Sequence, residues 1–373
     1  MMVRMTVAIG LAIIIASVSC VSQPHAVRQQ SEPGQAEQLA LDYLRREQTG
    51  EYGVHTNRLE TDQTGEAASG HEVLSESAGL LMRYYVARGK REEFAEAWLT
   101  AKRTFDQPEI FGYRYSPKVD KLYEINAAVD DLRIIRALFE AADIFQSKDY
   151  RKEAERYGAR FLKRNASGSR LYDFYDTRYH QTNGFLTLCY ADFRTLERLE
   201  KSSPTAGALS ERLLDIVEEG YLSDEFPFYA TRYVYESKSY DTDTIQMAES
   251  LLTVLHLAEI GAAKERSFDV IRDYVRSGTL YGQYARDGEP RNDVRSTALY
   301  AIAAQIGYEI GDRVLYADAM HRMSEFQILE KASPLYGGFG DTSTGQSYSF
   351  DNLMALLAHT MNQEADEEGG HSP

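Results

Sequence analysis

The sequence is poor in cysteine, in tryptophan and in positive charge. Cys20 and Cys189 are the only cysteines among 373 residues, which argues against a disulfide framework. Lys and Arg number 41 against 57 Asp and Glu, and the net charge of −16 argues against a nucleic-acid partner, because phosphate binding requires clustered cations. Nine prolines and a hydrophobic fraction of 43% are typical of a chain with a large buried core.

Motifs of metal and cofactor chemistry are also missing. The eight histidines are scattered and form neither HxH nor HExxH, and no GxSxG elbow occurs. The turn GGFGD at 337–341 lacks the context of a phosphate-binding loop. Cys189 lies in an apolar helical stretch typical of a small buried side chain. The sequence therefore predicts neither a metal nor a cofactor.

The N-terminus has the layout of a signal peptide. In MMVRMTVAIGLAIIIASVSC, basic Arg4 precedes an apolar run, and small residues lead to Cys20. This resembles a bacterial lipobox, in which Cys20 is lipid-modified. Ser17 stands where that motif usually has Leu, so simple secretion or an uncleaved anchor stays open. We expect a leader at 1–20, a polar tether at 21–35, and an extracytoplasmic protein that is anchored to the membrane or secreted.

Beyond the tether, apolar spacing predicts helices almost everywhere and few strands. Apolar segments such as LLTVLHLAEIG alternate with amphipathic ones such as REEFAEAWLTAKRTF. This alternation indicates an all-α fold, an (α/α)6 barrel of six helical hairpins over 36–365, with an acidic tail at 366–373. The expected helices span 35–47, 73–89, 92–106, 127–146, 149–164, 183–200, 206–219, 241–261, 265–277, 293–309, 313–328 and 348–362.

The connections between the predicted helices fall into two length classes. Those that lead out of the apolar helices are short, as in GKR, QSK and GDR, whereas those that lead into them run to roughly 16–25 residues. The long ones are rich in tyrosine and glycine, for example SRLYDFYDTRYHQT and TLYGQYARDGEPR. In a ring of hairpins all long connections lie at the same end, so this end is expected to bind a ligand.

Acidic and amide side chains stand at the predicted starts of the apolar helices. In HEVLSESAGLLMRYYVARG, Glu76 precedes an apolar stripe. The other starts carry Asp130 and Asp131, Asn183, Asp241 and Asp243, Asp293, and Asp351. Each fits an N-cap or an acid favoured by the helix dipole. Around one axis, however, carboxylates repel one another and burial raises some pKa values, which separates acid from base roles. Such carboxylates in a tyrosine-rich cleft predict acid–base chemistry on a glycosidic bond.

Three short motifs resemble those of glycoside hydrolase family 8. The SES at 75–77 resembles the family's Ser-Glu-Gly motif, although its glycine-rich continuation is replaced. AAVDDLRIIRA at 127–137 resembles Ala-Thr-Asp-x-Asp-Leu-x-Ile-Ala, shortened by about one residue. SYD at 239–241 resembles the start of Ser-Tyr-Asp-Ala-x-Arg, with Asp243 close to the place of the missing arginine. The resemblance extends over roughly 70–360, and it implies the same barrel.

The resemblance implies an inverting hydrolase with two catalytic carboxyl groups. Glu76 would donate a proton to the leaving glycosidic oxygen, and Asp241 would activate the attacking water. Asp243 stays open as the alternative base. Asp130 or Asp131 would hold a sugar hydroxyl. In inverting enzymes the two carboxyl groups stand roughly 6.5–9.5 Å apart, which leaves room for the water.

Aromatic and basic side chains in the long loops are the candidate substrate-binding groups, since tyrosine offers a sugar both an apolar face and a hydroxyl. They are Tyr113, Arg114, Tyr115, Tyr175, Tyr240 and Tyr284. Loop packing is the alternative for the tyrosines. For Arg114, pairing with a nearby acid is the favoured alternative.

The expected function is hydrolysis of a polysaccharide or oligosaccharide partner, without a cofactor. A bacterial exopolysaccharide or a β-1,4-linked glycan is the expected substrate, because the chain also resembles a divergent branch of Gram-positive surface lipoproteins linked to exopolysaccharide production. Two alternatives stay open: a polysaccharide-binding lipoprotein without catalysis, and a polysaccharide lyase. A lyase would be expected to use Tyr or His as its base, with Arg or a metal on a uronate carboxylate, so the carboxylate-rich helix starts argue against it.

Overall fold

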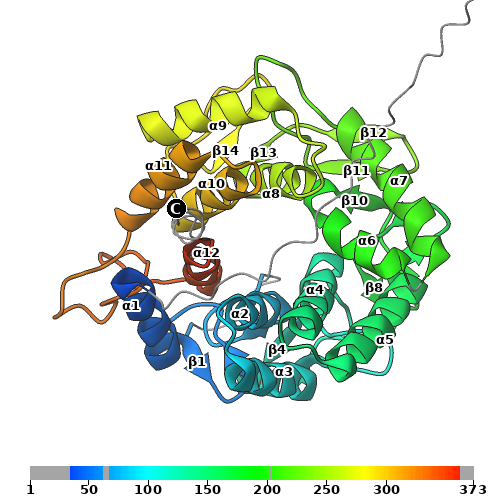
Figure 1. Cartoon of the computed structure of the whole chain (residues 1–373), viewed down its shortest axis with the longest axis horizontal. Coiled ribbons are helices and arrows are strands. Elements are labelled where there is room, and N and C mark those ends of the chain that lie inside the picture. The colour runs from blue at the N-terminus through cyan, green and yellow to red at the C-terminus, as the bar shows by residue number, and fades with distance from the viewer. Residues whose placement is uncertain (1–33, 62–66, 202, 362–373) are drawn as a thin grey trace, which may run out of the picture.

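The computed structural model describes residues 34–61, 67–201 and 203–361. Twelve α-helices in these ranges form an inner and an outer ring (Figure 1). The predicted leader, Cys20 and the acidic tail lie outside the described residues. Within those residues, the helices are too short or too polar to cross a membrane.

Six helices line the centre of the barrel, and six surround them. The inner ring consists of α2 (Ser75–Ala87), α4 (Ala128–Ile144), α6 (Phe193–Glu200), α8 (Met247–Ala258), α10 (Thr297–Glu309) and α12 (Ser349–His359). The outer ring consists of α1 (Gln35–Tyr43), α3 (Arg91–Phe105), α5 (Lys148–Asn165), α7 (Pro204–Glu219), α9 (Glu265–Ser277) and α11 (Arg313–Ser324). Each inner helix packs on the next, and α12 packs on α2. The predicted (α/α)6 barrel is confirmed.

The two rings differ in the way that the sequence predicts. In α10 every residue from Thr297 to Gly307 is buried, whereas the 18 residues of α5 bury only Ala154 and a few residues at its C-terminal half. An inner helix is covered on all sides, and an outer one buries a single stripe. Trp98 of α3, 2% exposed, joins two outer helices, because its indole Nε1 donates to Glu153 of α5 at 2.6 Å. The alternation of apolar and amphipathic segments therefore determines the two layers.

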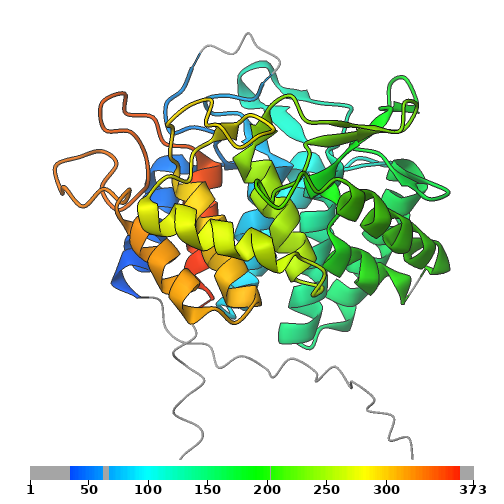
Figure 2. The ribbon, with the colours of Figure 1, turned by 90° about the horizontal axis from the view of Figure 1, so that it is seen from above.

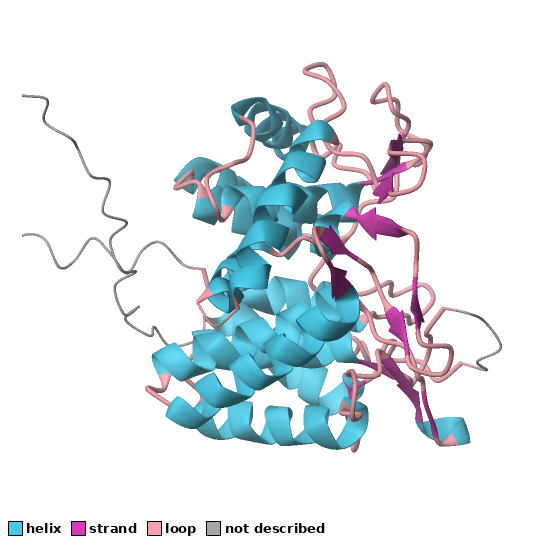
Figure 3. Ribbon diagram, turned by 90° about the vertical axis from the view of Figure 1, so that its right-hand side faces the viewer, coloured by secondary structure: helices cyan, strands magenta, loops and turns pink. Residues whose placement is uncertain are grey.

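The long connections carry fourteen short strands, which gather at one end of the helices (Figures 2 and 3). They are β1 (Thr49–Gly50), β2 (Gly53–Val54), β3 (Val73–Leu74), β4 (Arg114–Ser116), β5 (Lys121–Leu122), β6 (Ala166–Ser167), β7 (Arg170–Leu171), β8 (Tyr175–Asp176), β9 (Gln181–Thr182), β10 (Phe185–Thr187), β11 (Arg232–Val234), β12 (Ser239–Asp241), β13 (Ile245–Gln246) and β14 (Gln283–Tyr284). All of them are two or three residues long, so the expectation of an all-α fold with few strands is confirmed. Each pairing is antiparallel, and β3-β4-β5 and β10-β11-β12 form three-stranded sheets.

Three predicted helix starts are wrong, two because these strands occupy them and one because an irregular segment precedes the helix. The expected helix 183–200 begins with β10 and the 3₁₀ turn η3 (Leu188–Tyr190), so α6 starts only at Phe193. The expected helix 241–261 begins with strand residues, and α8 starts at Met247. The expected helix 293–309 begins with an irregular segment, and Ser296 caps α10 by accepting a hydrogen bond from the Leu299 amide. Pairing with neighbouring loops thus overrides local helical spacing.

Candidate active site

Four of the six inner helices carry an acid in their first turn. Glu76 starts α2, Asp130 and Asp131 start α4, Glu249 starts α8, and Asp351 starts α12. The N-terminal end of a helix stabilises a negative charge there, but burial opposes it and, for example, raises the pKa of Asp351. The long connections that carry the strands lead into these helix starts, so the acids stand at the end of the barrel where the strands gather (Figure 3).

One guanidinium holds the first two of these acids. Nη1 of Arg133 lies 3.3 Å from Oε2 of Glu76 and 2.8 Å from Oδ1 of Asp130. Burial raises the pKa of Glu76, and the Arg133 charge opposes that shift. Burial also raises the pKa of Asp130 to about 7, with the Glu76 charge adding to the rise and Arg133 opposing it. Two acids and one cation thus share this position, so a proton is retained there near neutral pH.

The spacing between α2 and α4 depends on a glycine. A Cβ placed on Gly79 would lie 2.9 Å from the Cβ of Arg133 and 3.3 Å from its carbonyl carbon. Only a residue without a side chain allows this approach, which brings Glu76 within reach of Arg133. The close approach of α2 and α4 therefore explains why a glycine, Gly79, stands three residues after the predicted acid Glu76.

Asp131 does not share this environment. It is 2% exposed, and its Oδ2 accepts a hydrogen bond of 2.9 Å from Asn126. Its Oδ1 is buried without a hydrogen-bond partner in the described part of the chain. Burial raises the pKa of Asp131 to about 8. Of the two aspartates left open by the sequence, Asp130 is the one beside Glu76.

The predicted base candidates lie on strands and loops, not at a helix start. Asp241 ends β12, half-buried, directly opposite Arg232 of β11 in the strand register. Its Oδ1 accepts a hydrogen bond of 3.3 Å from the Asp243 amide. Asp243 is exposed, and its carbonyl accepts a hydrogen bond from Arg291. Of the two, Asp241 lies deeper.

Two acids that the sequence analysis missed lie near Asp241. Asp173, 7% exposed, accepts hydrogen bonds from the amide and the hydroxyl of Thr187 at 2.8 and 2.6 Å. Burial raises the pKa of Asp173 to about 6. Burial also raises the pKa of Glu249, Arg232 opposes the shift, and the negative charges of Asp173 and Asp241 add to it. Since α8 was predicted to start at 241, Glu249 was hidden two turns inside the expected helix.

Tyr190 connects the two groups of acids. It ends η3, and burial raises its pKa well above the usual range. The charges of Asp130 and Asp173 both add to this shift, and Arg133 opposes it. The acids of α4 and those beside α8 therefore act on the same hydroxyl. Together they form one cluster at the strand-bearing end of the barrel.

The predicted substrate-binding side chains differ in how far the structure buries them. Arg114 is 2% exposed and forms an ion pair of 2.6 Å with Glu72, so pairing with an acid is the interpretation that the structure favours. Tyr284 is 1% exposed, and its hydroxyl donates to the Thr279 carbonyl at 2.6 Å, which corrects its placement as a sugar platform. A side chain buried among other rings has no free face for a ligand.

The other predicted tyrosines lie in the loops. Tyr175 is buried, with its hydroxyl 3.2 Å from Nδ1 of His180, so it too offers little surface. The hydroxyl of Tyr240 donates to the Ile216 carbonyl at 2.8 Å. Tyr113 and Tyr115 are half-buried on or beside β4, which pairs with β3, the strand that directly precedes α2 and Glu76. These two remain candidates.

Lower in the barrel, Asp192, His256 and Glu259 place three potential metal-ligating atoms within 4.8 Å of one another. The guanidinium of Arg136 supplies the positive charge that a metal ion would bring, because it lies 2.5 Å from Glu259 and 3.5 Å from Asp192. This arrangement satisfies the carboxylates by ion pairing.

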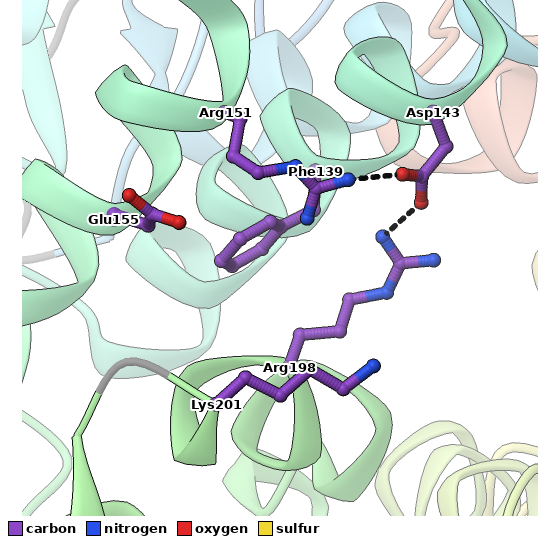
Figure 4. Close-up of a pocket in the computed structure, with 6 residues that line it drawn as sticks. All are labelled: Phe139, Asp143, Arg151, Glu155, Arg198 and Lys201. Carbon is purple, nitrogen blue, oxygen red and sulfur yellow. Dashed lines mark hydrogen bonds and ion pairs between the residues drawn. The ribbon is translucent and has the colours of Figure 1, made fainter. Parts of the chain in front are cut away.

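A separate pocket of about 160 Å³ lies beyond this network (Figure 4). Its lining is Phe139, Asp143, Arg151, Glu155, Arg198 and Lys201. Arg198 pairs with Asp143 at 2.8 Å, and Arg151 pairs with the same carboxylate. Asp143 stands 13 residues after Asp130 on α4, or about 20 Å along the helix at 1.5 Å per residue. This pocket is therefore not part of the acidic cluster.

Known proteins support a carbohydrate-related interpretation. No family model matches the chain. A solved structure described as a novel alpha-amylase from Clostridium perfringens is 30% identical, with a TM-score of 0.82 over 89% of this chain and 100% of that one. Endoglucanase Cel10 from Klebsiella pneumoniae, a family 8 glycosyl hydrolase, is 15% identical, with a TM-score of 0.61 over 86% and 98%. At that identity the likeness shows the fold alone.

Two further bacterial proteins are similar to the chain over most of its length. YdaJ of Bacillus subtilis (strain 168), provisionally named a lipoprotein, is 27% identical over 291 residues, 76% of this chain and 78% of that one. PssZ from Listeria monocytogenes is 19% identical, with a TM-score of 0.67 over 90% and 98%. The ring of hairpins is the fold of the family 8 glycosyl hydrolases. At 30% identity over 89% of its length, the chain belongs to the same family as the Clostridium perfringens protein described as an alpha-amylase, among the glycoside hydrolases.

Proposed function

We propose that this protein hydrolyses glycosidic bonds of a polysaccharide by an inverting mechanism, with Glu76 as the general acid. The pairing of Glu76 and Asp130 through Arg133 supports the proposal, because two acids share one cation at this position. Burial, which raises the pKa of Glu76, keeps a proton available for the leaving oxygen.

The remaining roles follow from placement and from the family resemblance. Asp130, beside Glu76, would accept a hydrogen bond from a sugar hydroxyl and hold the ring at the bond to be cleaved. The resemblance offers Asp241, with Asp243 as the alternative, as a candidate for the group that removes a proton from the attacking water. Tyr113 and Tyr115, which border the strand before Glu76, would pack against neighbouring sugars.

Two substrate classes deserve separate tests. The resemblance to exopolysaccharide-linked lipoproteins favours a bacterial exopolysaccharide or a β-1,4-linked glycan. The 30% identical protein from Clostridium perfringens is described as an alpha-amylase, which favours an α-linked glucan as the second candidate. The (α/α)6 fold does not choose between them, since one fold hosts several specificities.

The test is release of reducing ends from amylose, β-1,4-glucans, xylan and bacterial exopolysaccharides. We expect activity on one of these, and a loss of about 10²–10⁴-fold in Glu76→Gln, the usual contribution of a general acid. Glu92→Gln is the matched control, since Glu92 is an exposed acid in the first turn of the outer helix α3. Full activity in Glu76→Gln contradicts the proposal. Binding without hydrolysis supports the polysaccharide-binding alternative, and unsaturated products support a lyase.

We further propose that the domain is held outside the cell by a lipid on Cys20, as the lipobox-like leader and the name of the YdaJ relative suggest. Expression with a radiolabelled fatty acid tests this. Label is expected on the protein and should be absent from Cys20→Ala. Label that persists in the variant contradicts lipidation at this cysteine.

A further inference from the structure

The first turn of α8 faces the first turn of α2 across the barrel. These are the fourth and the first of the six inner helices, and α8 lies across the ring from α2 (Figure 1). Glu76 is the second residue of α2, and Glu249 is the third residue of α8. An inverting enzyme needs its acid and its base on opposite faces of the sugar. Glu249 is the acid in the first turn of the helix across the ring from α2.

The surroundings of Glu249 are those of a reactive group and not of a structural one. Its Oε2 is buried and makes no hydrogen bond within the described residues. The buried acid Glu259 of the same helix region, in contrast, accepts two hydrogen bonds from Arg136. Leaving a buried carboxylate oxygen without a partner costs free energy that the fold does not recover. A fold keeps such a group where a ligand or a water supplies the missing contact.

The base candidates suggested by the resemblance are less well placed. Asp241 stands on β12 opposite the cation of Arg232, and one of its oxygens already accepts the Asp243 amide. Asp243 is exposed on the connection to β13. Asp241 nevertheless acts on Glu249, because its negative charge makes Glu249 a stronger base. Asp241 is therefore a positioning and tuning residue.

We propose that Glu249 is the general base of the hydrolysis, a role that rests on the proposed function. The water oxygen forms a bond to the anomeric carbon and gives its proton to Glu249. The bond from that carbon to the glycosidic oxygen breaks, and the leaving oxygen receives the proton of Glu76. Glu249 ends protonated and Glu76 ionised, and exchange with solvent restores both. Neither an oxidant nor a cofactor takes part.

The test compares Glu249→Ala, Glu249→Gln and Asp241→Asn on the polysaccharide that the unmodified protein cleaves. Both Glu249 variants are expected to lose about 10²–10⁴-fold in kcat. Azide should restore turnover in Glu249→Ala by replacing the water, since an anionic nucleophile needs no base, and the product should be a glycosyl azide of inverted configuration. Asp241→Asn should move the acidic limb of the pH profile to lower pH, whereas the Glu249 variants should lose kcat over the whole pH range.

The controls separate this assignment from the proposed function. Glu218→Gln, an exposed acid of α7, is expected to be fully active, and thermal unfolding checks that each variant is folded. A folded Glu249→Gln with ordinary kcat overturns the assignment, and so does azide rescue of Asp241→Ala in place of Glu249→Ala. In both cases loss of activity in Glu76→Gln leaves the proposed function standing. An unmodified protein without hydrolytic activity overturns both proposals.

Discussion

Arg133 and Glu76 are joined across two inner helices, with 3.3 Å between the guanidinium Nη1 and the carboxylate Oε2. The same nitrogen serves Asp130 of its own helix at 2.8 Å. Burial drives the pKa of each acid upward, and the shared cation limits the rise. Arg133 therefore sets the pH range in which Glu76 keeps its proton.

Replacing this cation should move the pH profile. In Arg133→Met the pKa of Glu76 loses its opposing charge and rises, so the acid stays protonated to higher pH. The alkaline limb of kcat/KM against pH is expected to shift upward by about one unit or more, with a lower maximum because Glu76 is less firmly held. Arg212→Met on the outer helix α7 is the control, since Arg212 pairs with the exposed Asp215. A limb that stays in place or moves to lower pH contradicts this role.

Gly79→Ala should destabilise the protein, although alanine is the better helix former. The added Cβ would meet the Cβ of Arg133 at 2.9 Å, so α2 and α4 must move apart. Gly207→Ala in α7 is the matched control, because its nearest neighbour, a flexible Glu200 side chain, stays at 3.4 Å. The control should gain up to about 1 kcal/mol and Gly79→Ala should lose about 1–3 kcal/mol in urea unfolding. A stabilised Gly79→Ala would refute the close approach of the two helices.

Asp131→Asn should make stability less sensitive to pH. Burial raises the pKa of Asp131 to about 8 in the folded state, from an ordinary value of 3.8. The protonated form therefore favours folding below about pH 4, and this contribution is lost as pH rises towards 8. One pKa unit corresponds to about 1.4 kcal/mol, so the variant is expected to gain at least about 1 kcal/mol at pH 8 and almost nothing at pH 4. Equal gains at both pH values in thermal melts would count against a buried, neutral Asp131.

The buried ion pair of Arg136 and Glu259 should be costly to break from one side. Both side chains are less than 5% exposed, and Asp192 depends on the same guanidinium. Arg136→Met leaves two buried carboxylates without their cation and is expected to lose about 3–5 kcal/mol in urea unfolding. The exposed pair of Arg212 should lose less than about 1 kcal/mol in Arg212→Met. Similar losses in the two variants would show that burial does not govern these pairs.

The sequence predicted the rings of the barrel far better than its rim. Helical periodicity is a local property, and the short connections GKR, QSK and GDR leave each hairpin only one way to pair, so the layers follow directly. Strand pairing is different, because Arg232 meets Asp241 and Phe185 meets Val234 only once the loops are in place. The periodicity of one segment does not predict with which other segment it will pair as a strand.

The site shows the same division. Glu76 was found because its helix begins where the apolar stripe begins, and Asp130 because it lies in the next motif. Glu249 was missed because the strand residues 239–246 look like the start of α8. Tyr284 and Arg114 were assigned to the cleft because residue type alone does not reveal burial, and the structure covers both. A search for acids about three residues after each true helix start would have found Glu249.

Trp98 makes the outer ring spectroscopically visible. It is the single indole of the chain, buried between α3 and α5 and hydrogen-bonded to Glu153. Its emission therefore comes from one place, and a shift to longer wavelength marks water reaching that seam. The contact between α3 and α5 belongs to the helical part of the barrel, whereas the candidate catalytic acids lie at its strand-bearing end. Trp98 fluorescence therefore reports whether the barrel is folded while sugar hydrolysis is followed in the same sample. Each variant above can in this way report its own folding during its assay.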